Sequence, residues 1–189
     1  MSLSWFRGNK RQIFLTTWSV ISFAFVACQH EPVLRQAATF SAIEHGYWCH
    51  SQPVSNDLCQ LEIELTSLTN EFRYQNGLAP LRHDPALAFV AYQQSQRAAR
   101  AGTISHAGFP ETRQALLQNF DASRQLSIQA ENLLRLKTSE TDRKLIVRRI
   151  LYHWQNSPSH RRQLLGPHRA HGASLVFHQG FIFAAAMFQ

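Results

Sequence analysis

The end of the chain reads as two β-type runs joined by a short turn, and this pattern limits the fold most. Residues 173–177 and 181–188 are rich in apolar and aromatic side chains, and Gly180 between them can adopt a positive φ angle. The patterned sequence before these runs is mainly helical. Helices followed by a closing hairpin predict an α+β domain in which helices cover a sheet.

Four segments ahead of the hairpin have the three- and four-residue apolar spacing of amphipathic helices. We expect helices over residues 58–76, 85–101, 139–154 and 158–165. Asp84 and Pro85 mark the start of the second helix, and Gly102 marks its end. The third is expected to begin at Ser139, with Asp142 as the acid of a capping box.

Residues 103–138 have a weaker pattern. The Gly and Pro of residues 105–110 indicate a loop, and residues 126–136 read either as a strand or as an irregular buried run. The chain has 189 residues, of which 44% are hydrophobic and 16% charged. That composition excludes a disordered or collagen-like chain, and the length fits one ordinary domain.

Residues 1–27 have the build of a secretory signal peptide. Their charges are all positive, and residues 13–27 form an uncharged stretch of 15 residues that ends in small side chains. This stretch is shorter than the roughly 20 apolar residues of a spanning helix. An uncleaved membrane helix and simple secretion remain open alternatives.

The signal ends in Phe25, Val26, Ala27 and Cys28, which resembles the lipobox of bacterial lipoproteins. We therefore expect Cys28 to carry lipid and to anchor the mature chain in a membrane of the cell envelope. Lipoproteins that are retained at the inner membrane commonly have Asp directly after the lipid-bearing Cys. This chain has Gln29 there, which favours the outer membrane where the cell has one. Residues 28–57 are read as lipidated N-terminus and tether, and residues 58–189 as the folded domain.

Cys49 and Cys59 form an even pair once Cys28 is assigned to lipid. An exported chain meets an oxidising compartment, so we expect a disulfide that closes a small loop. Two independent thiols are the alternative. A metal pair is disfavoured, because neither cysteine belongs to a C-x-x-C spacing.

The formal net charge is +7, and no acidic residue follows Asp142. Nucleic acid is not the expected partner, because an exported chain meets little of it. The basic residues also alternate with apolar helix positions and form no aromatic-lined groove. Anionic lipid head groups or acidic envelope polymers are the expected counterparts.

Conventional catalytic signatures such as G-x-S-x-G and H-E-x-x-H are absent from the sequence. What remains is a dispersed set of polar residues and one tryptophan. It comprises His106, Glu131, Asn132, Trp154, Ser157 and His160. His168, His171 and His178 show no comparable pattern and are read as solvated.

A series of short motifs surrounds these residues. In order they are L-T-N-E-F-R-Y-Q-N-G-L-A-P-L, D-P-A-L, S-H-A-G-F, A-E-N, W-x-x-S-P-S-H-R and H-G-A-S-L. Their order and spacing resemble bacterial members of the CAP superfamily, the cysteine-rich secretory, antigen 5 and pathogenesis-related proteins, also called the SCP-like extracellular domain. The resemblance covers about residues 60–189. It implies a three-layer α-β-α sandwich with a C-terminal β-hairpin and a central cleft.

The resemblance also implies that two histidines and two acids meet in the cleft and, in some relatives, hold a divalent metal, often zinc. His106 and His160 match the histidines, and Glu131 matches the acid of a G-E-N motif that has Ala130 in place of Gly. The second acid has no match, because Ser157 or Asn156 stands there. That departure weakens the case for a four-ligand site.

Elementary chemistry supports part of this assignment. His160 lies at the third position of a short helix, where the helix dipole disfavours the protonated ring. Neutral imidazole is the form that binds zinc, so His106 and His160 are candidate zinc ligands. The plainer alternatives are that His160 hydrogen-bonds within its helix, that Glu131 and Asn132 are structural, and that Trp154 belongs to the core.

Two functions follow as hypotheses. The first is a non-enzymatic binding module, anchored by lipid, whose cleft holds a small ligand, a lipid or an envelope component. The second is a metal-dependent hydrolase of envelope peptide or glycan, with Glu131 as the candidate catalytic base. Asn132, Trp154 and Ser157 are expected to support the cleft in either case.

Overall fold

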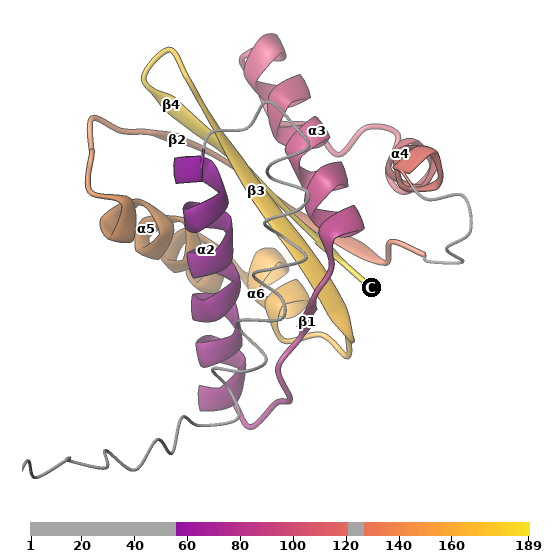
Figure 1. The fold of residues 1–189 in the computed structure, drawn as a ribbon. Helices are drawn as coiled ribbons and strands as arrows, with labels where there is room; N and C mark the ends of the chain where they lie inside the picture. The colour runs from indigo at the N-terminus through magenta and orange to yellow at the C-terminus, as the bar shows by residue number, and fades with distance from the viewer. Residues whose placement is uncertain (1–55, 121–126) are drawn as a thin grey trace, which may run out of the picture. The chain divides into compact units, whose positions relative to one another are not determined.

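A computed structural model describes residues 56–120 and 127–189 (Figure 1). The elements, in chain order, are α2 (Asn56–Gln75), β1 (Arg82–His83), α3 (Pro85–Ala101), α4 (Glu111–Phe120), β2 (Ala130–Lys137), α5 (Arg143–Asn156), α6 (Pro158–Leu164), β3 (Ala170–His178) and β4 (Phe181–Phe188). The predicted signal peptide, the lipid site at Cys28, the tether and Cys49 lie outside the described residues. Cys59 is buried at the start of α2, and its predicted pairing with Cys49 stays a prediction.

The sheet has four strands in the order β1-β3-β4-β2. β3 and β4 form the expected hairpin, and its turn has positive φ angles at Gln179 (48°) and Gly180 (75°). β2 pairs with β4 in antiparallel register, with Glu131 opposite Met187. The two-residue β1 pairs parallel to β3. Residues 130–137, for which the sequence left a strand and an irregular run open, therefore form a strand. Within the sheet, β4 lies between its hairpin partner β3 and β2.

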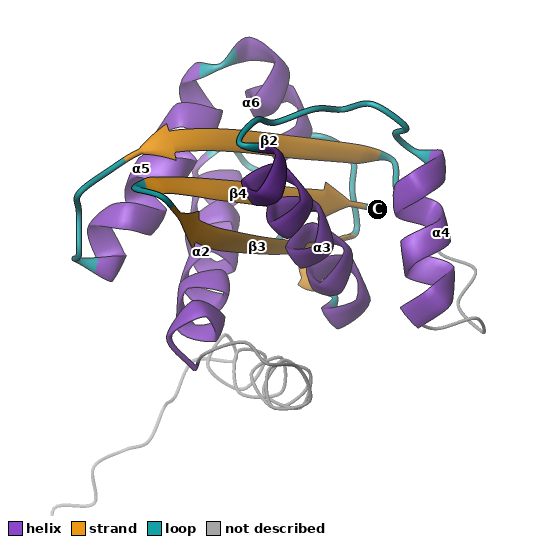
Figure 2. Ribbon diagram, turned by 90° about the horizontal axis from the view of Figure 1, so that it is seen from above, coloured by secondary structure: helices purple, strands orange, loops and turns teal. Residues whose placement is uncertain are grey.

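Helices cover both faces of the sheet, which confirms the three-layer α-β-α architecture (Figure 2). Alternate residues of β4 belong to two different cores, as the two-residue period of a strand requires. Ala184, Ala186 and Phe188 pack with α2, α5 and α6. Ala185 and Met187 pack with α3 and α4 on the other face.

The α3 helix begins and ends where the sequence predicts. The Asp84 carboxylate accepts hydrogen bonds from the N–H groups of Ala86 and Leu87, and Gly102 ends the helix with φ of 68°. The helix lies so close to β3 that a Cβ at Gly172 would collide with the backbone of Ala88. A glycine is therefore required in this strand for the close approach.

A buried arginine joins α2 to the end of α6. Arg73 donates from Nε to the carbonyl of Ala79 at 2.9 Å, and from Nη1 to the carbonyls of Leu164 (2.8 Å) and Gly166 (2.9 Å). Burial lowers the pKa of its guanidinium. The carbonyls at the C-terminal end of a helix need partners, and Arg73 supplies them for α6 from a helix distant in sequence.

One helix was missed from the sequence, and the predicted start of another was wrong. The α4 helix was not predicted at all, and it buries only Arg113 and Leu117 along its length. The α5 helix begins after Asp142, whose carboxylate accepts from the N–H groups of Lys144 and Leu145, so Ser139 is not its cap. None of the helices in the two described ranges is both long enough and apolar enough to span a membrane.

Candidate functional site

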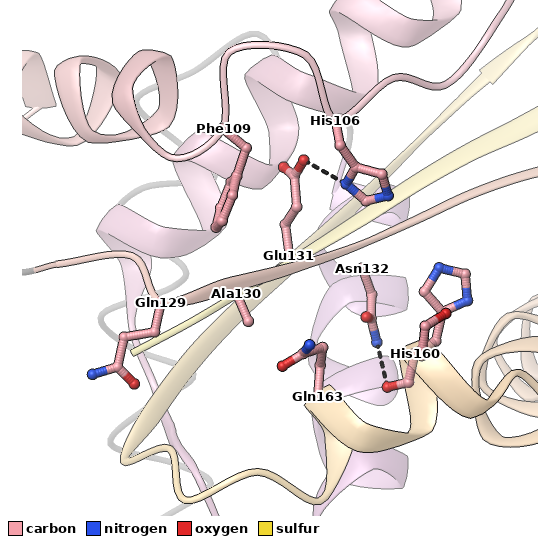
Figure 3. A pocket seen from close by; sticks show the side chains of 9 residues that line it. His106, Phe109, Gln129, Ala130, Glu131, Asn132, His160 and Gln163 are labelled. Atoms are coloured by element: carbon pink, nitrogen blue, oxygen red, sulfur yellow. Dashed lines mark hydrogen bonds and ion pairs between the residues drawn. The ribbon is translucent and has the colours of Figure 1, made fainter.

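The loop after α3 and the start of β2 place His106 against Glu131 (Figure 3). The His106 Nδ1 atom lies 2.8 Å from Glu131 Oε1. The imidazole is 58% exposed, whereas the carboxylate is 1% exposed. An ionised carboxylate can only accept, so Nδ1 carries the proton and donates, which leaves Nε2 free to meet a ligand.

The buried guanidinium of Arg113, on α4, holds the same carboxylate from the other side. Its Nε donates to Glu131 Oε2 and its Nη2 to Oε1, both at 3.0 Å. It also donates to the backbone carbonyls of Ser105 (3.1 Å) and Ala107 (3.0 Å), the residues on either side of His106. One side chain thus fixes both the acid and the loop that presents the histidine, in the two-pronged geometry that arginine offers.

Arg113 was not predicted from the sequence. A weak signal was present, because Arg113 and Leu117 are four residues apart and share the one buried stripe of α4. An arginine on a buried stripe needs a charged partner, since burying an unpaired charge costs several kcal/mol. The pattern does not say which acid that partner is.

Asn132 connects β2 to the helix that carries the second histidine. Its Nδ2 donates to the backbone carbonyl of His160 at 3.1 Å (Figure 3). The pKa of His160 is lowered, first by burial and second by the nearby His106. The predicted direction is confirmed, but burial and His106 account for it. The neutral form of the His160 ring is therefore favoured.

Trp154 and Ser157 lie beside the cleft without lining it. Trp154 is fully buried on α5 within the core beneath α2, as the plainer alternative expected. Ser157 occupies the N-cap position of α6, but its side chain makes no capping hydrogen bond. Its hydroxyl lies 3.3 Å from that of Ser159. Trp154 lies in the last turn of α5, and Ser157 stands between α5 and α6; their support of the cleft stays a prediction.

The predicted cleft residues share one cavity of about 360 Å³. The cavity is lined by His106, Phe109, Gln129, Ala130, Glu131, Asn132, Ser159, His160 and Gln163. Figure 3 shows His106 beside Glu131 on one side of the β2 strand and His160 beside Asn132 on the other, so the cavity extends around this edge strand. The structure thus brings together the residues that the motifs indicated, from three separate segments of the chain.

The donor set does not suit a tightly held zinc ion. Within residues 56–120 and 127–189, no three His, Cys, Asp or Glu side chains are grouped so that they could hold a metal. Both oxygens of Glu131 are already hydrogen-bonded to Arg113. His106 and His160 remain as the two candidate ligands, whereas catalytic zinc sites have three protein ligands. Zinc at these two histidines stays a prediction.

Outside the cleft, the reading of His171 as solvated was wrong. His171 is 1% exposed because β3 is paired on both sides and α2 and α3 cover it. Its ring stacks on Phe188 with a centroid distance of 5.9 Å. Burial, with smaller effects of Arg73 and His168, lowers its pKa to about 4.

The fold and the cleft define a class of α-β-α sandwich proteins, and comparison with known proteins names it. Residues 66–173 match the model of the cysteine-rich secretory protein family, CAP. The chain belongs to this family. No curated protein matches the sequence.

Three solved structures are similar in fold, each with a TM-score of 0.50. An outer surface protein of Borrelia burgdorferi is 23% identical, with 66% of this chain and 89% of that chain covered. A cysteine-rich secretory protein of Staphylococcus aureus is 19% identical, with 72% and 40% covered. An extracellular SCP-domain protein of Bacillus anthracis is 20% identical, with 73% and 45% covered. The chain thus spans less than half of the last two.

Proposed function

We propose that this chain is an exported, lipid-anchored CAP-domain protein whose cleft binds a small ligand, a lipid or an envelope component without reacting with it. The observation that carries this proposal is the bonding of Glu131. A general base must be free to take a proton from its substrate. Both oxygens of Glu131 are hydrogen-bonded to buried Arg113, and Oε1 also accepts from His106. The acid therefore orients the histidine.

The chemistry of the cavity wall fits recognition of an uncharged polar group. The His160 ring, whose neutral form is favoured by its lowered pKa, the Gln163 amide and His106 Nε2 offer hydrogen-bonding groups beside the apolar side chain of Phe109. The volume of about 360 Å³ is at the small end of the range for ligand pockets. A sugar unit or a polar head group has suitable size and hydrogen-bonding capacity.

The proposed location rests on the N-terminal sequence and on the relatives. The similar structures are described as an outer surface, a secretory and an extracellular protein. The signal-like residues 1–27 and the lipobox-like end at Cys28 fit the same compartment. Substituting Cys28→Ser is expected to prevent signal cleavage and lipid attachment. Mass spectrometry of the membrane-extracted chain measures both, and an unmodified wild-type Cys28 would exclude the anchor.

Ligand binding is tested on the full chain extracted from envelope membranes in mild detergent. Native mass spectrometry is expected to show a co-purifying small molecule on the wild type, and His160→Ala is expected to lose it. His153→Ala is the matched control, because His153 is an exposed histidine of α5 outside the cavity. A wild type with no bound species, and no thermal shift with phospholipids or wall fragments, would end the proposal.

The second candidate function is a metal-dependent hydrolase, and the hydrogen bond between His106 and Glu131 favours it. Carboxylates commonly fix the tautomer of metal-binding histidines in this way. Elemental analysis of the full chain after exposure to micromolar zinc distinguishes the two candidates. Zinc bound by the wild type and lost in His106→Ala would favour the hydrolase, and equal metal content in both would exclude it.

A further inference from the structure

The α5 helix has a polar outer face in addition to its buried one. Its inner face packs in the core through Ile146, Val147, Ile150, Leu151 and Trp154. On the outer face two apolar side chains remain in solvent, Leu145 at 44% exposure and Tyr152 at 62%. They are seven residues apart, so they lie on the same side of the helix, two turns from each other.

Basic side chains surround this apolar pair. Arg148 and Arg149 lie between Leu145 and Tyr152 in the helix, and Lys144 precedes them, all three exposed. Arg149 Nη1 donates to Thr138 Oγ1 at 3.1 Å, and a neutral hydroxyl does not neutralise the charge of a guanidinium. No acidic residue follows Asp142 in the sequence, and Asp142 itself caps the helix. The face defined by Lys144, Leu145, Arg148, Arg149 and Tyr152 is therefore cationic with an apolar centre.

We propose that this outer face of α5 docks on a membrane surface of anionic phospholipid. Each Lys or Arg near such a surface adds to the electrostatic attraction, and a leucine and a tyrosine can enter the interface between head groups and acyl chains. A soluble acidic polymer would satisfy the charges but would leave Leu145 and Tyr152 in water. The exposed apolar pair is the reason for assigning the surface to lipid.

This inference rests on the proposed envelope location and adds an orientation to it. A lipid at Cys28 would hold the domain near the bilayer, so that a weak surface contact becomes effectively intramolecular. The docked face is on α5, whereas the cavity lies between β2, α6 and the loop of His106. Docking through α5 therefore uses none of the residues that line the cleft.

The test uses the full chain reconstituted in vesicles, with Tyr152→Trp as the reporter. In vesicles of phosphatidylglycerol and brominated phosphatidylcholine, the emission that the introduced tryptophan adds to the wild-type spectrum is expected to be mostly lost by quenching. In vesicles of brominated phosphatidylcholine alone, and at high salt, the emission is expected to return. Arg148→Gln combined with Arg149→Gln is expected to restore it as well.

Tyr74→Trp is the matched control, because Tyr74 is an 80% exposed tyrosine of α2, and its emission is expected to stay unquenched. Equal quenching of the two variants, or no quenching of Tyr152→Trp in anionic vesicles, would overturn the assignment to α5. Acrylamide quenching of the Tyr152→Trp emission provides a further check. If soluble polyglutamate reduces this quenching and vesicles do not, the face binds an acidic polymer and the assignment to lipid is wrong. None of these outcomes depends on whether the cleft binds a ligand.

Discussion

Histidine has two opposite roles in this domain, at His106 beside the cleft and at His171 inside the sandwich. His106 is mostly exposed, and a buried acid and a buried arginine hold it in place. His171 is buried against Phe188, and neither of its ring nitrogens has a hydrogen-bond partner in the described part of the chain. One histidine is kept available for binding by a charged network, and the other serves as a neutral aromatic ring.

The largest effect is expected where the charged network is broken. Arg113→Met leaves the buried carboxylate of Glu131 without its ion pair, which is expected to lower the free energy of unfolding by about 3–5 kcal/mol. Urea denaturation measures the change. The double variant Arg113→Met with Glu131→Leu removes both charges and is expected to recover most of the loss. A single variant as stable as the wild type would show that the network does not hold the loop of His106.

The next effect is a pH dependence that arises at His171. Its pKa is about 4 in the folded chain, against an ordinary value of 6.5, so between these values the unfolded chain binds the proton more readily. The contribution of the neutral ring is complete above pH 6.5 and is lost as the pH falls toward 4. At pH 4.5 this titration lowers the free energy of unfolding by about 2–3 kcal/mol relative to neutral pH.

The control for this prediction is His171→Phe, which keeps an aromatic ring and removes the titrating group. Urea denaturation of both chains at pH 7 and pH 4.5 isolates the histidine, because the carboxylates titrate alike in each. The variant is expected to lose less stability on acidification. If both chains lose the same amount, burial of His171 does not govern the acid response.

A smaller effect is expected at the exposed histidine. His106→Ala removes one hydrogen bond from a side chain in solvent and leaves Arg113 paired with Glu131, so it should cost about 1 kcal/mol or less. Thermal unfolding measures this change, and native mass spectrometry measures the accompanying loss of ligand. If His106→Ala destabilises the domain as much as Arg113→Met does, His106 would have a structural role like that of His171, and the contrast between the two would fail.

The smallest effect concerns the support of His160. Ser157→Ala removes a side chain that makes no capping hydrogen bond, so the change in stability should be near zero. Asp84→Ala, at a cap that does accept two N–H groups, should cost about 1 kcal/mol by the usual value of a cap. Thermal unfolding compares the two, and equal losses would indicate that Ser157 fixes the helix of the second histidine.

The sequence predicted correctly those helices and strands whose signals, such as caps, apolar spacing and turn glycines, lie within the element or at its ends. The caps of α3, the apolar stripe of α2 and the glycine of the final turn are such signals, and the structure bears them out. The family resemblance gave His106, Glu131 and His160, which the cavity unites. Arg113 and His171 were not foreseen, because their burial depends on how distant strands and helices pack, which a pattern of near neighbours does not contain.

The bonds of Arg73 bear on the order in which the chain can fold. Its partners at Leu164 and Gly166 follow it by 91 and 93 residues, so a chain made from its N-terminus presents the guanidinium long before the carbonyls that satisfy it. Contacts at such sequence separation form slowly, because a long loop must close first. The helix that carries His160 is therefore fixed to α2 only after nearly the whole domain has been synthesised.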